Sequence, residues 1–166
     1  MRLVLSVVAV AMIPVIPVSG QVFVDGGMKL AATSERISVG ANVTAHDSRC
    51  SVNTQLLEAE AERAFRRDGL EVGRPTSTAL RIAVITLPST SVAGVFRGCV
   101  ASLTIQLLTV LSTEPETLLL AADDGKLFAS GPDGAHVRQL RSGVEESVSV
   151  IANRVRRLRD EARPNQ

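Results

Sequence analysis

Apolar and polar residues alternate without a break over residues 36–45. Because successive side chains of a β-strand point to opposite sides, a period of two predicts a strand with one buried face. The residues expected to face the core are Ile37, Val39, Ala41, Val43 and Ala45. Similar patterns predict a second strand over 78–87 and a third over 99–111. The second pattern is more continuously apolar, which indicates a central place in a sheet.

Two other segments repeat their apolar residues with the period of a helix. The first covers 53–69, where Asn53 is suited to an N-cap and Gly69 to a left-handed C-terminal position. Its apolar face consists of Leu57, Ala61, Ala64 and Phe65. The second covers 142–162, where Ser142 and Glu145 have the spacing of a capping box. Both segments are predicted to be helices that pack on the sheet, and the arginine-rich end of the second is expected to be a solvated face.

Three segments have weaker patterns. Residues 21–34 contain the sequence Asp-Gly-Gly, which is typical of a turn, so we expect an N-terminal tail or a small hairpin there. Residues 88–98 are expected to form a loop. Residues 113–125 are compatible with either a strand or a helix. Asp124 and Gly125 then predict a turn into a strand over 126–130.

The first twenty residues have the layout of a bacterial secretory signal peptide. Arg2 is followed by an apolar run over 3–18, and small residues come just before position 21. We expect cleavage of 1–20 after Gly20, which would leave Gln21 as the first residue and no stable membrane span in the mature chain. The alternative is an uncleaved membrane anchor, although the run is shorter than the roughly 20 residues that a spanning helix needs.

Length and charge narrow the class of protein. A chain of 166 residues fits one globular domain, which we expect over 35–163, with 164–166 as a frayed tail. Loss of Arg2 from the 18 basic residues leaves 17, against 17 acidic residues. The mature chain would therefore be neutral, and it has no Trp or Tyr to stack on bases. Nucleic acid is not an expected partner.

Two cysteines, Cys50 and Cys99, are the most informative polar residues. In an exported domain, two cysteines are most simply a disulfide. Cys50 follows the first predicted strand and Cys99 begins the third. If those strands are antiparallel neighbours, the two sulfur atoms meet. The first and second strands would then be parallel and would flank the third, with the first helix as a right-handed crossover.

The expected fold class is therefore α+β. We predict a two-layer sandwich with a split β-α-β core, four or five mostly antiparallel strands, and two helices on one face. The other face, rich in threonine and serine, is left for solvent or a partner. This order of elements resembles that of small bacterial envelope domains such as the N-terminal domain of the Tol translocation protein, and no motif identifies a family.

The other candidate chemistries are weaker. A thiol-dependent enzyme would use Cys50 with His46 and Asp47, but a disulfide removes the nucleophile. A metal site needs three or four ligands, whereas His46 and His136 are far apart in sequence and the cysteines lack C-x-x-C spacing. His136 is expected to lie on an exposed loop. No nucleotide-binding or serine-hydrolase motif is present.

The sequence therefore predicts no catalytic, cofactor-binding or metal-binding residue. The expected function is that of an exported, non-catalytic bacterial protein, either periplasmic or secreted. It would act as an accessory module that binds a protein or another envelope component through a sheet edge or the polar sheet face. The alternative is an exported thiol-dependent enzyme that uses Cys50 with His46.

Overall fold

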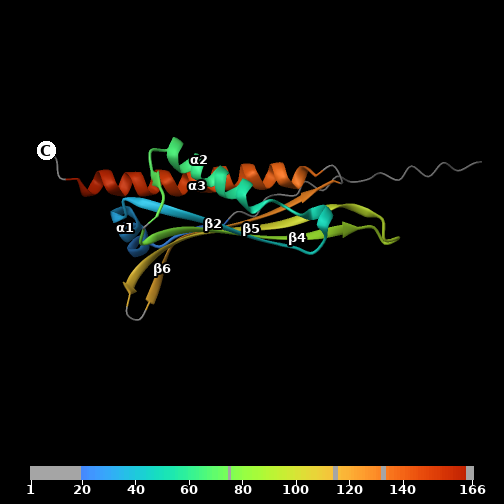
Figure 1. Ribbon diagram of the computed structural model, residues 1–166, viewed down its shortest axis with the longest axis horizontal. Coiled ribbons are helices and arrows are strands. Elements are labelled where there is room, and N and C mark those ends of the chain that lie inside the picture. Colours follow the sequence, from blue (N-terminus) through green and yellow to red (C-terminus); the bar gives the residue numbers. More distant parts are fainter. Residues whose placement is uncertain (1–19, 75, 114–115, 132–133, 164–166) are drawn as a thin grey trace, which may run out of the picture.

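The computed structural model describes residues 20–74, 76–113, 116–131 and 134–163 (Figure 1). The predicted signal peptide and the predicted frayed tail at 164–166 thus lie outside the described residues, apart from Gly20. The elements follow one another as β1 (Gly20–Phe23), α1 (Asp25–Thr33), β2 (Arg36–Ala45), the short 3₁₀ helix η1 (Ser48–Cys50), α2 (Thr54–Arg67), β3 (Glu71–Val72), β4 (Thr78–Thr90), β5 (Phe96–Thr113), β6 (Glu116–Ser130) and α3 (Ala135–Ala162).

The fold is α+β, with one mostly antiparallel sheet in the order β1-β6-β5-β4-β2-β3. The described residues form six strands and three α-helices, rather than the four or five strands and two helices that the sequence predicted. Strand β2 is parallel to both of its neighbours, β3 and β4, while β4, β5, β6 and β1 pair in antiparallel fashion.

The predicted split β-α-β core is wrong. β2 lies directly beside β4 over eight paired residues, from Ser38 opposite Ala79 to Ala45 opposite Thr86, so β5 does not separate them. The prediction assumed that a disulfide between the ends of two strands makes those strands neighbours. A disulfide requires only that the two Cα atoms lie within about 7 Å of each other. A short turn that follows a strand can bring its cysteine this close to another strand even when a third strand lies between the two.

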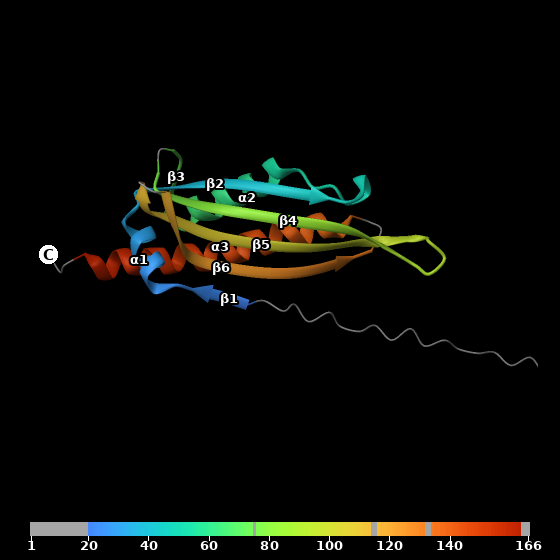
Figure 2. The same ribbon diagram turned by 90° about the horizontal axis from the view of Figure 1, so that it is seen from below.

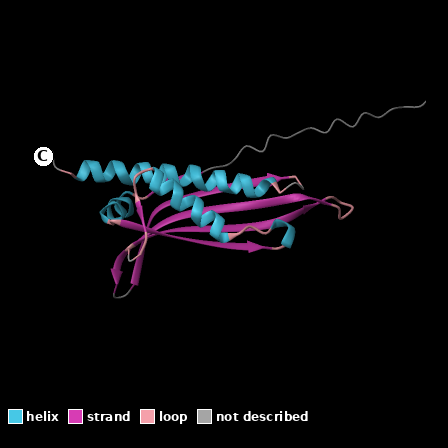
Figure 3. Cartoon of the chain, turned by 45° about the horizontal axis from the view of Figure 1, so that its top comes forward, coloured by secondary structure: helices cyan, strands magenta, loops and turns pink. Residues whose placement is uncertain are grey.

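Helices α2 and α3 cover one face of the sheet, and α1 packs against α3, β5 and β6 at one end (Figures 1 and 3). On the covered face, every second residue of the central strands is buried. Those side chains are Leu80, Ile82 and Val84 of β4 and Ala101, Leu103, Ile105 and Leu107 of β5. Phe65 of α2 and Ile151 of α3 close over them. Each such large side chain contributes about 1.5–3 kcal/mol when it leaves water.

The first residues after the predicted cleavage site are ordered. Where the sequence predicted a tail or a small hairpin over 21–34, the structure has β1 at the sheet edge and helix α1. Gly27 explains the difference. A Cβ atom there would lie 2.4 Å from the carbonyl oxygen of Leu120 on β6, so this glycine permits close packing of a helix on a strand and does not form a turn.

Within the region 113–125, which was compatible with strand or helix, residues 116–125 belong to strand β6, Thr113 ends β5, and 114–115 lie outside the described residues. β6 continues through Asp124 and Gly125, which pair with Ile105 and Thr104 of β5, so the turn predicted at these two residues is absent. Asp124 is only 1% exposed and accepts a hydrogen bond from the hydroxyl of Ser147 on α3. An aspartate with a partner in the helix layer is compatible with a strand interior.

Two boundaries also differ from the prediction. Most of the loop predicted over 88–98 is strand, because β4 extends to Thr90 and β5 begins at Phe96. Helix α3 begins at Ala135, after Gly134 in the left-handed conformation. Ser142 and Glu145 therefore lie inside the helix, so the predicted capping box does not cap it.

Candidate functional site

The disulfide joins η1 to the start of β5. The sulfur atoms of Cys50 and Cys99 lie 2.01 Å apart and the two Cα atoms 5.7 Å apart, so the structure has the pairing that the sequence predicted. Cys99 is opposite Pro88 of β4, and the Cys50 sulfur lies 3.8 Å from the carbonyl oxygen of Leu87. η1 thus carries Cys50 across β4, at Leu87 and Pro88, to reach β5.

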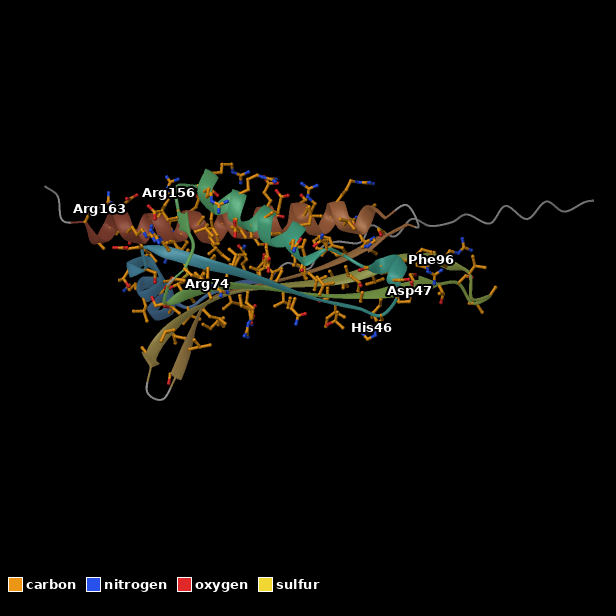
Figure 4. All side chains as sticks on the ribbon, viewed as in Figure 1. His46, Asp47, Arg74, Phe96, Arg156 and Arg163 are labelled. Carbon is orange, nitrogen blue, oxygen red and sulfur yellow. A yellow bond between two sulfur atoms is a disulfide. The ribbon has the colours of Figure 1, made fainter. Side chains whose placement is uncertain are left out.

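The polar residues around Cys50 hold one another in place. The Asp47 carboxylate accepts hydrogen bonds from the backbone N–H of Arg49 at 2.9 Å and from its guanidinium at 3.0 and 2.7 Å. The side-chain hydrogen bonds from Arg49 lower the pKa of Asp47 to about 2. The Arg49 guanidinium also lies 4.2 Å from the centroid of the Phe96 ring. His46, Asp47 and Phe96 all lie near the β4–β5 hairpin (Figure 4).

This arrangement does not support the thiol-dependent alternative. Among the described residues, no cysteine is free, because both sulfur atoms belong to the bridge. The carboxylate of Asp47 faces Arg49, so its charge is already paired. His46 is exposed at the end of β2. The residues that resembled a catalytic set in the sequence instead have structural contacts: Cys50 is in the disulfide, and Asp47 pairs with Arg49.

His136 is buried, and the prediction of an exposed loop histidine is wrong. Its side chain is 2% exposed in the first turn of α3, because this helix begins earlier than the sequence indicated. Neither ring nitrogen has a hydrogen-bond partner among the described residues. No group of three or more His, Cys, Asp or Glu side chains in the described part of the chain is arranged to hold a metal ion.

Other buried polar groups connect the layers of the fold. The carboxylate of Glu60 on α2 accepts hydrogen bonds from Arg141 on α3 at 2.8 Å and from Arg63 at 3.0 Å. The ammonium of Lys126 on β6 donates to Glu146 on α3 at 2.6 Å. Each of these contacts pairs a cation with an anion, as burial of charge requires. They fix α2 and α3 over the sheet.

The surface that stands apart is the open face of the sheet, on the side opposite α2 and α3. Because Leu80, Ile82 and Val84 point toward the helices, the alternate residues of β4 point to this open face. Figure 2 views the sheet from this side and shows β2, β4, β5 and β6 in front of the helices. No helix of the described residues lies over the central part of this face.

The open face has an apolar part. Near the β4–β5 hairpin, the large apolar side chains of this face that are about half exposed are Ile85, Leu87 and Leu127, at 49%, 47% and 50%. Across the strands, Ile85 is opposite Ser102, which is opposite Leu127. Leu87 is opposite Val100 in the neighbouring row. Apolar side chains therefore alternate with a hydroxyl over three strands, toward the β4–β5 hairpin.

Farther from the hairpin, a polar row crosses the open face. Arg81 of β4 is opposite Gln106 of β5, which is opposite Asp123 of β6. Between the apolar part and this polar row, Ala83 pairs with Thr104. The sequence predicted a threonine- and serine-rich face and missed the apolar part. The continuous apolar pattern of the second strand was the available signal, while Leu127 was hidden by the turn predicted at 124–125.

No helix in the described residues combines the length and the hydropathy that crossing a membrane requires. No family model and no curated protein matches the chain. Among solved structures, the chain is similar to the PelC dodecamer from Paraburkholderia phytofirmans, with 13% identity, a TM-score of 0.49, and 84% of this chain and 97% of that one covered.

The rare lipoprotein B from Shewanella oneidensis is also similar, with 12% identity, a TM-score of 0.31, and 75% and 94% of the two chains covered. A further similar structure is a protein from Xanthomonas campestris, at 16% identity and a TM-score of 0.38, with 70% and 78% covered. Because these identities and scores are low, no residue role or activity is carried over to this chain.

Proposed function

We propose that this chain is an exported, non-catalytic bacterial protein, periplasmic or secreted, that binds a partner protein through the open face of its sheet. The observation that carries the proposal is the group of half-exposed apolar side chains on a sheet face without a covering layer. Soluble domains usually bury such a face against a second layer, and an apolar patch rimmed by polar residues is typical of a binding site.

Two features support export. The first twenty residues have the charge, apolar run and small residues of a signal peptide. The Cys50–Cys99 bridge is of the kind that forms and persists in oxidising compartments. Cleavage after Gly20 would leave Gln21, Val22 and Phe23 of β1 paired with β6, so removal of the leader is compatible with the fold.

The chemistry of the open face suggests how the partner is held. Ile85, Leu87 and Leu127 would each lose their remaining contact with water, which contributes about 1 kcal/mol per half-exposed side chain. Ser102 lies between Ile85 and Leu127 and offers a hydroxyl to the partner's polar groups. Such a mixed surface fits a protein partner with its own apolar patch, because apolar contacts supply the affinity and hydrogen bonds fix the orientation.

The test uses the exported, mature chain in bacteria. A photoreactive amino acid placed at Ser102 is expected to capture one partner that the same probe at Arg63, which is exposed on α2, does not capture. The partner is then identified and purified, and its affinity for the chain is measured. Substitution of both Ile85→Asp and Leu127→Asp should weaken binding at least tenfold, which corresponds to about 1.4 kcal/mol.

The matched control is Val150→Asp, because Val150 is a half-exposed apolar residue on α3, in the helix layer. This variant should bind the partner as well as the unmodified chain does. Capture from Arg63 alone, or equal binding by the double variant with its fold intact, would contradict the proposal. The export part is tested separately by the mass of the protein in the periplasm or medium, which should begin at Gln21; a full-length chain in the cytosol would refute it.

A further inference from the structure

Two hollows of similar volume lie along the C-terminal half of α3. One, of about 550 Å³, lies between α3 and β1. The other, of about 560 Å³, lies between the last turns of α3 and the C-terminal half of α1, and we refer to it as the α1–α3 groove. Both volumes fall in the range of about 300–1,000 Å³ that is usual for small-molecule sites. They differ in how the charges around them are paired.

The cations of the first hollow have acidic partners. Arg154 lies 3.4 Å from the carboxylate of Asp25, and Arg157 lies 4.0 Å from that of Glu161. Each guanidinium thus already has an anion within ion-pair distance. The first hollow offers little to a charged ligand.

The cations of the α1–α3 groove are not paired in this way. The side chains of Lys29 and Arg163 have no hydrogen-bond or ion-pair partner among the described residues, and both line the groove. Arg159 also lines it, and its guanidinium donates to the backbone carbonyl oxygens of Ala32, at 3.0 Å, and Ser34. The carboxylate that lines the groove, that of Glu161, is shared with Arg157.

Arg159 has a second cation close to it. Its pKa is lowered, first by burial and then by the charge of Arg163, while the charge of Glu71 acts in the opposite direction. Arg159 caps the carbonyl end of α1, a place where a cation interacts favourably with the helix dipole. The position of the Arg159 side chain is thus fixed by α1, and Arg163 lies near it. An anion between Arg163 and Lys29 would relieve the repulsion between like charges.

The floor of the groove is apolar. It is formed by Ala32 of α1 and by Leu158 and Ala162 of α3, together with the aliphatic parts of the cationic side chains. Leu158 is 9% exposed, so a small apolar strip is open to solvent beneath the cations. A groove with an apolar floor and a cationic rim is complementary to a molecule that joins an apolar chain to an anionic head.

We propose that the α1–α3 groove binds a single-chain anionic amphiphile, a long-chain carboxylate or alkyl phosphate, with its head between Lys29 and Arg163 and its chain along Ala32, Leu158 and Ala162. A volume of about 560 Å³ suits one chain. The groove is in the helix layer, and Arg163 lies at the opposite end of the molecule from Phe96 and the β4–β5 hairpin (Figure 4). This inference goes beyond the proposed function and does not depend on it.

The experiment follows backbone amide signals of the mature chain by NMR during titration with dodecyl phosphate below its micelle concentration. The expected result is saturable shifts at Ala32, Leu158 and Ala162. Lys29→Glu and Arg163→Glu should each weaken binding at least tenfold with an unchanged fold. Arg97→Glu, the same charge change at an exposed residue of β5, is the matched control and should leave affinity unchanged.

The comparison ligands separate the two parts of the site. Inorganic phosphate should bind at least tenfold more weakly than dodecyl phosphate, and a neutral dodecyl amphiphile should also bind at least tenfold more weakly. If inorganic phosphate bound as tightly as dodecyl phosphate, the proposed role of the apolar floor would be overturned. If the neutral amphiphile bound as tightly as dodecyl phosphate, the proposed role of the cations would be overturned. Shifts spread over the open sheet face instead of the groove, or binding to anionic lipid vesicles without binding to monomers, would also overturn the proposal.

Discussion

The carboxylate of Glu58 on α2 accepts a hydrogen bond of 2.8 Å from the backbone N–H of Ala41 on β2. This contact lies on the outer edge of β2, where β3 pairs with Arg36 and Ile37 and no further. The carbonyl oxygen of Ile37 accepts from Gly73 on the same edge. Because backbone groups alternate along a strand, those of Val39 and Val43 also point outward. Glu58 thus blocks the middle of an otherwise open strand edge.

We predict that Glu58→Ala makes this edge available for strand pairing between molecules. Loss of a hydrogen bond to a charged group should lower the free energy of unfolding by about 1–2 kcal/mol. The exposed edge should also produce concentration-dependent dimers or aggregates. Denaturant unfolding and light scattering measure the two effects.

Two further variants separate edge protection from loss of charge. Glu58→Gln keeps a side-chain oxygen that can accept from Ala41 and should stay monomeric to the same extent as the unmodified chain. Glu62→Ala removes a surface carboxylate that pairs with Arg66 on the same helix and should change neither property by much. Aggregation of the Gln variant to the same degree as the Ala variant would show that the negative charge, and not the hydrogen bond, keeps molecules apart.

The disulfide should supply a large part of the stability. It closes a loop with a sequence separation of 49, for which chain entropy gives about 4 kcal/mol. Replacement of both cysteines by serine should therefore lower the free energy of unfolding by up to about 4 kcal/mol. Denaturant unfolding with and without reductant measures this, since reductant should destabilise the unmodified chain and leave the double variant unaffected.

Alkylation of the native, unreduced protein provides an independent check. Neither sulfur should be labelled, and the mass should increase only after unfolding and reduction. Labelling of Cys50 in the native protein would contradict the bridge and would restore the thiol-dependent alternative with His46.

The cysteines also show what the sequence could and could not reveal. Exported domains with two cysteines have a strong chemical reason to form a bridge, so the pairing followed from composition and the predicted compartment. The strand order did not follow, because η1 allows Cys50 to cross β4 at Leu87 before it meets Cys99. A disulfide fixes the distance between two points and leaves open which strand lies between them.

The Asp47–Arg49 pair predicts a small dependence of stability on pH. The pKa of Asp47 in the folded chain is about 2, below its ordinary value of 3.8. Because the folded-state pKa is depressed, the stabilising contribution is fully present above about pH 4 and is lost as the pH falls through about 2. NMR titration of the Asp47 carboxyl should give a midpoint near 2 in the unmodified chain.

Replacement of Arg49 removes the cause of that shift. In Arg49→Gln, the charged side-chain donor is lost, so the midpoint of Asp47 should move upward, toward its ordinary range. Since both residues are at the surface, global stability at neutral pH should change little. An unchanged midpoint would show that the backbone N–H of residue 49 alone holds the carboxylate in its charged form.

Gly98 is the position where the backbone leaves least room. Its φ is +145°, and a Cβ atom there would lie 1.8 Å from the carbonyl oxygen of Ser130. Gly98→Ala should therefore destabilise the fold by about 2–4 kcal/mol, since both strain and a clash must be relieved. Gly40→Ala is the matched control on β2, where nothing lies within 4 Å of the added atom. Thermal unfolding of the two variants should differ by more than 5 °C.

Strand and helix periodicity predicted β2, β4, β5, α2 and most of α3 because each turns one face toward the core. On the predicted core face of β2, however, Ile37 is buried, Val39, Ala41 and Val43 are half-buried, and Ala45 is exposed. The prediction failed where a residue type that is typical of turns instead makes a contact with another element of the fold. Gly27 resembled a turn residue but provides space for Leu120 of β6, and Asp124 resembled a turn residue but pairs with Ser147. The apolar part of the open face was missed for the same reason, because a residue's exposure depends on which layer covers it.

His136 provides the last test, since its burial followed from an earlier helix start than the sequence indicated. Its ring is 2% exposed, and both nitrogens lack a partner among the described residues. A buried polar atom without a hydrogen bond costs about 1–3 kcal/mol. His136→Leu, which fills a similar volume with apolar atoms, should therefore raise the free energy of unfolding by about 1 kcal/mol. His46→Leu, at an exposed site, is the control and should have little effect, whereas a loss of stability in His136→Leu would mean that a ring nitrogen is hydrogen-bonded in solution.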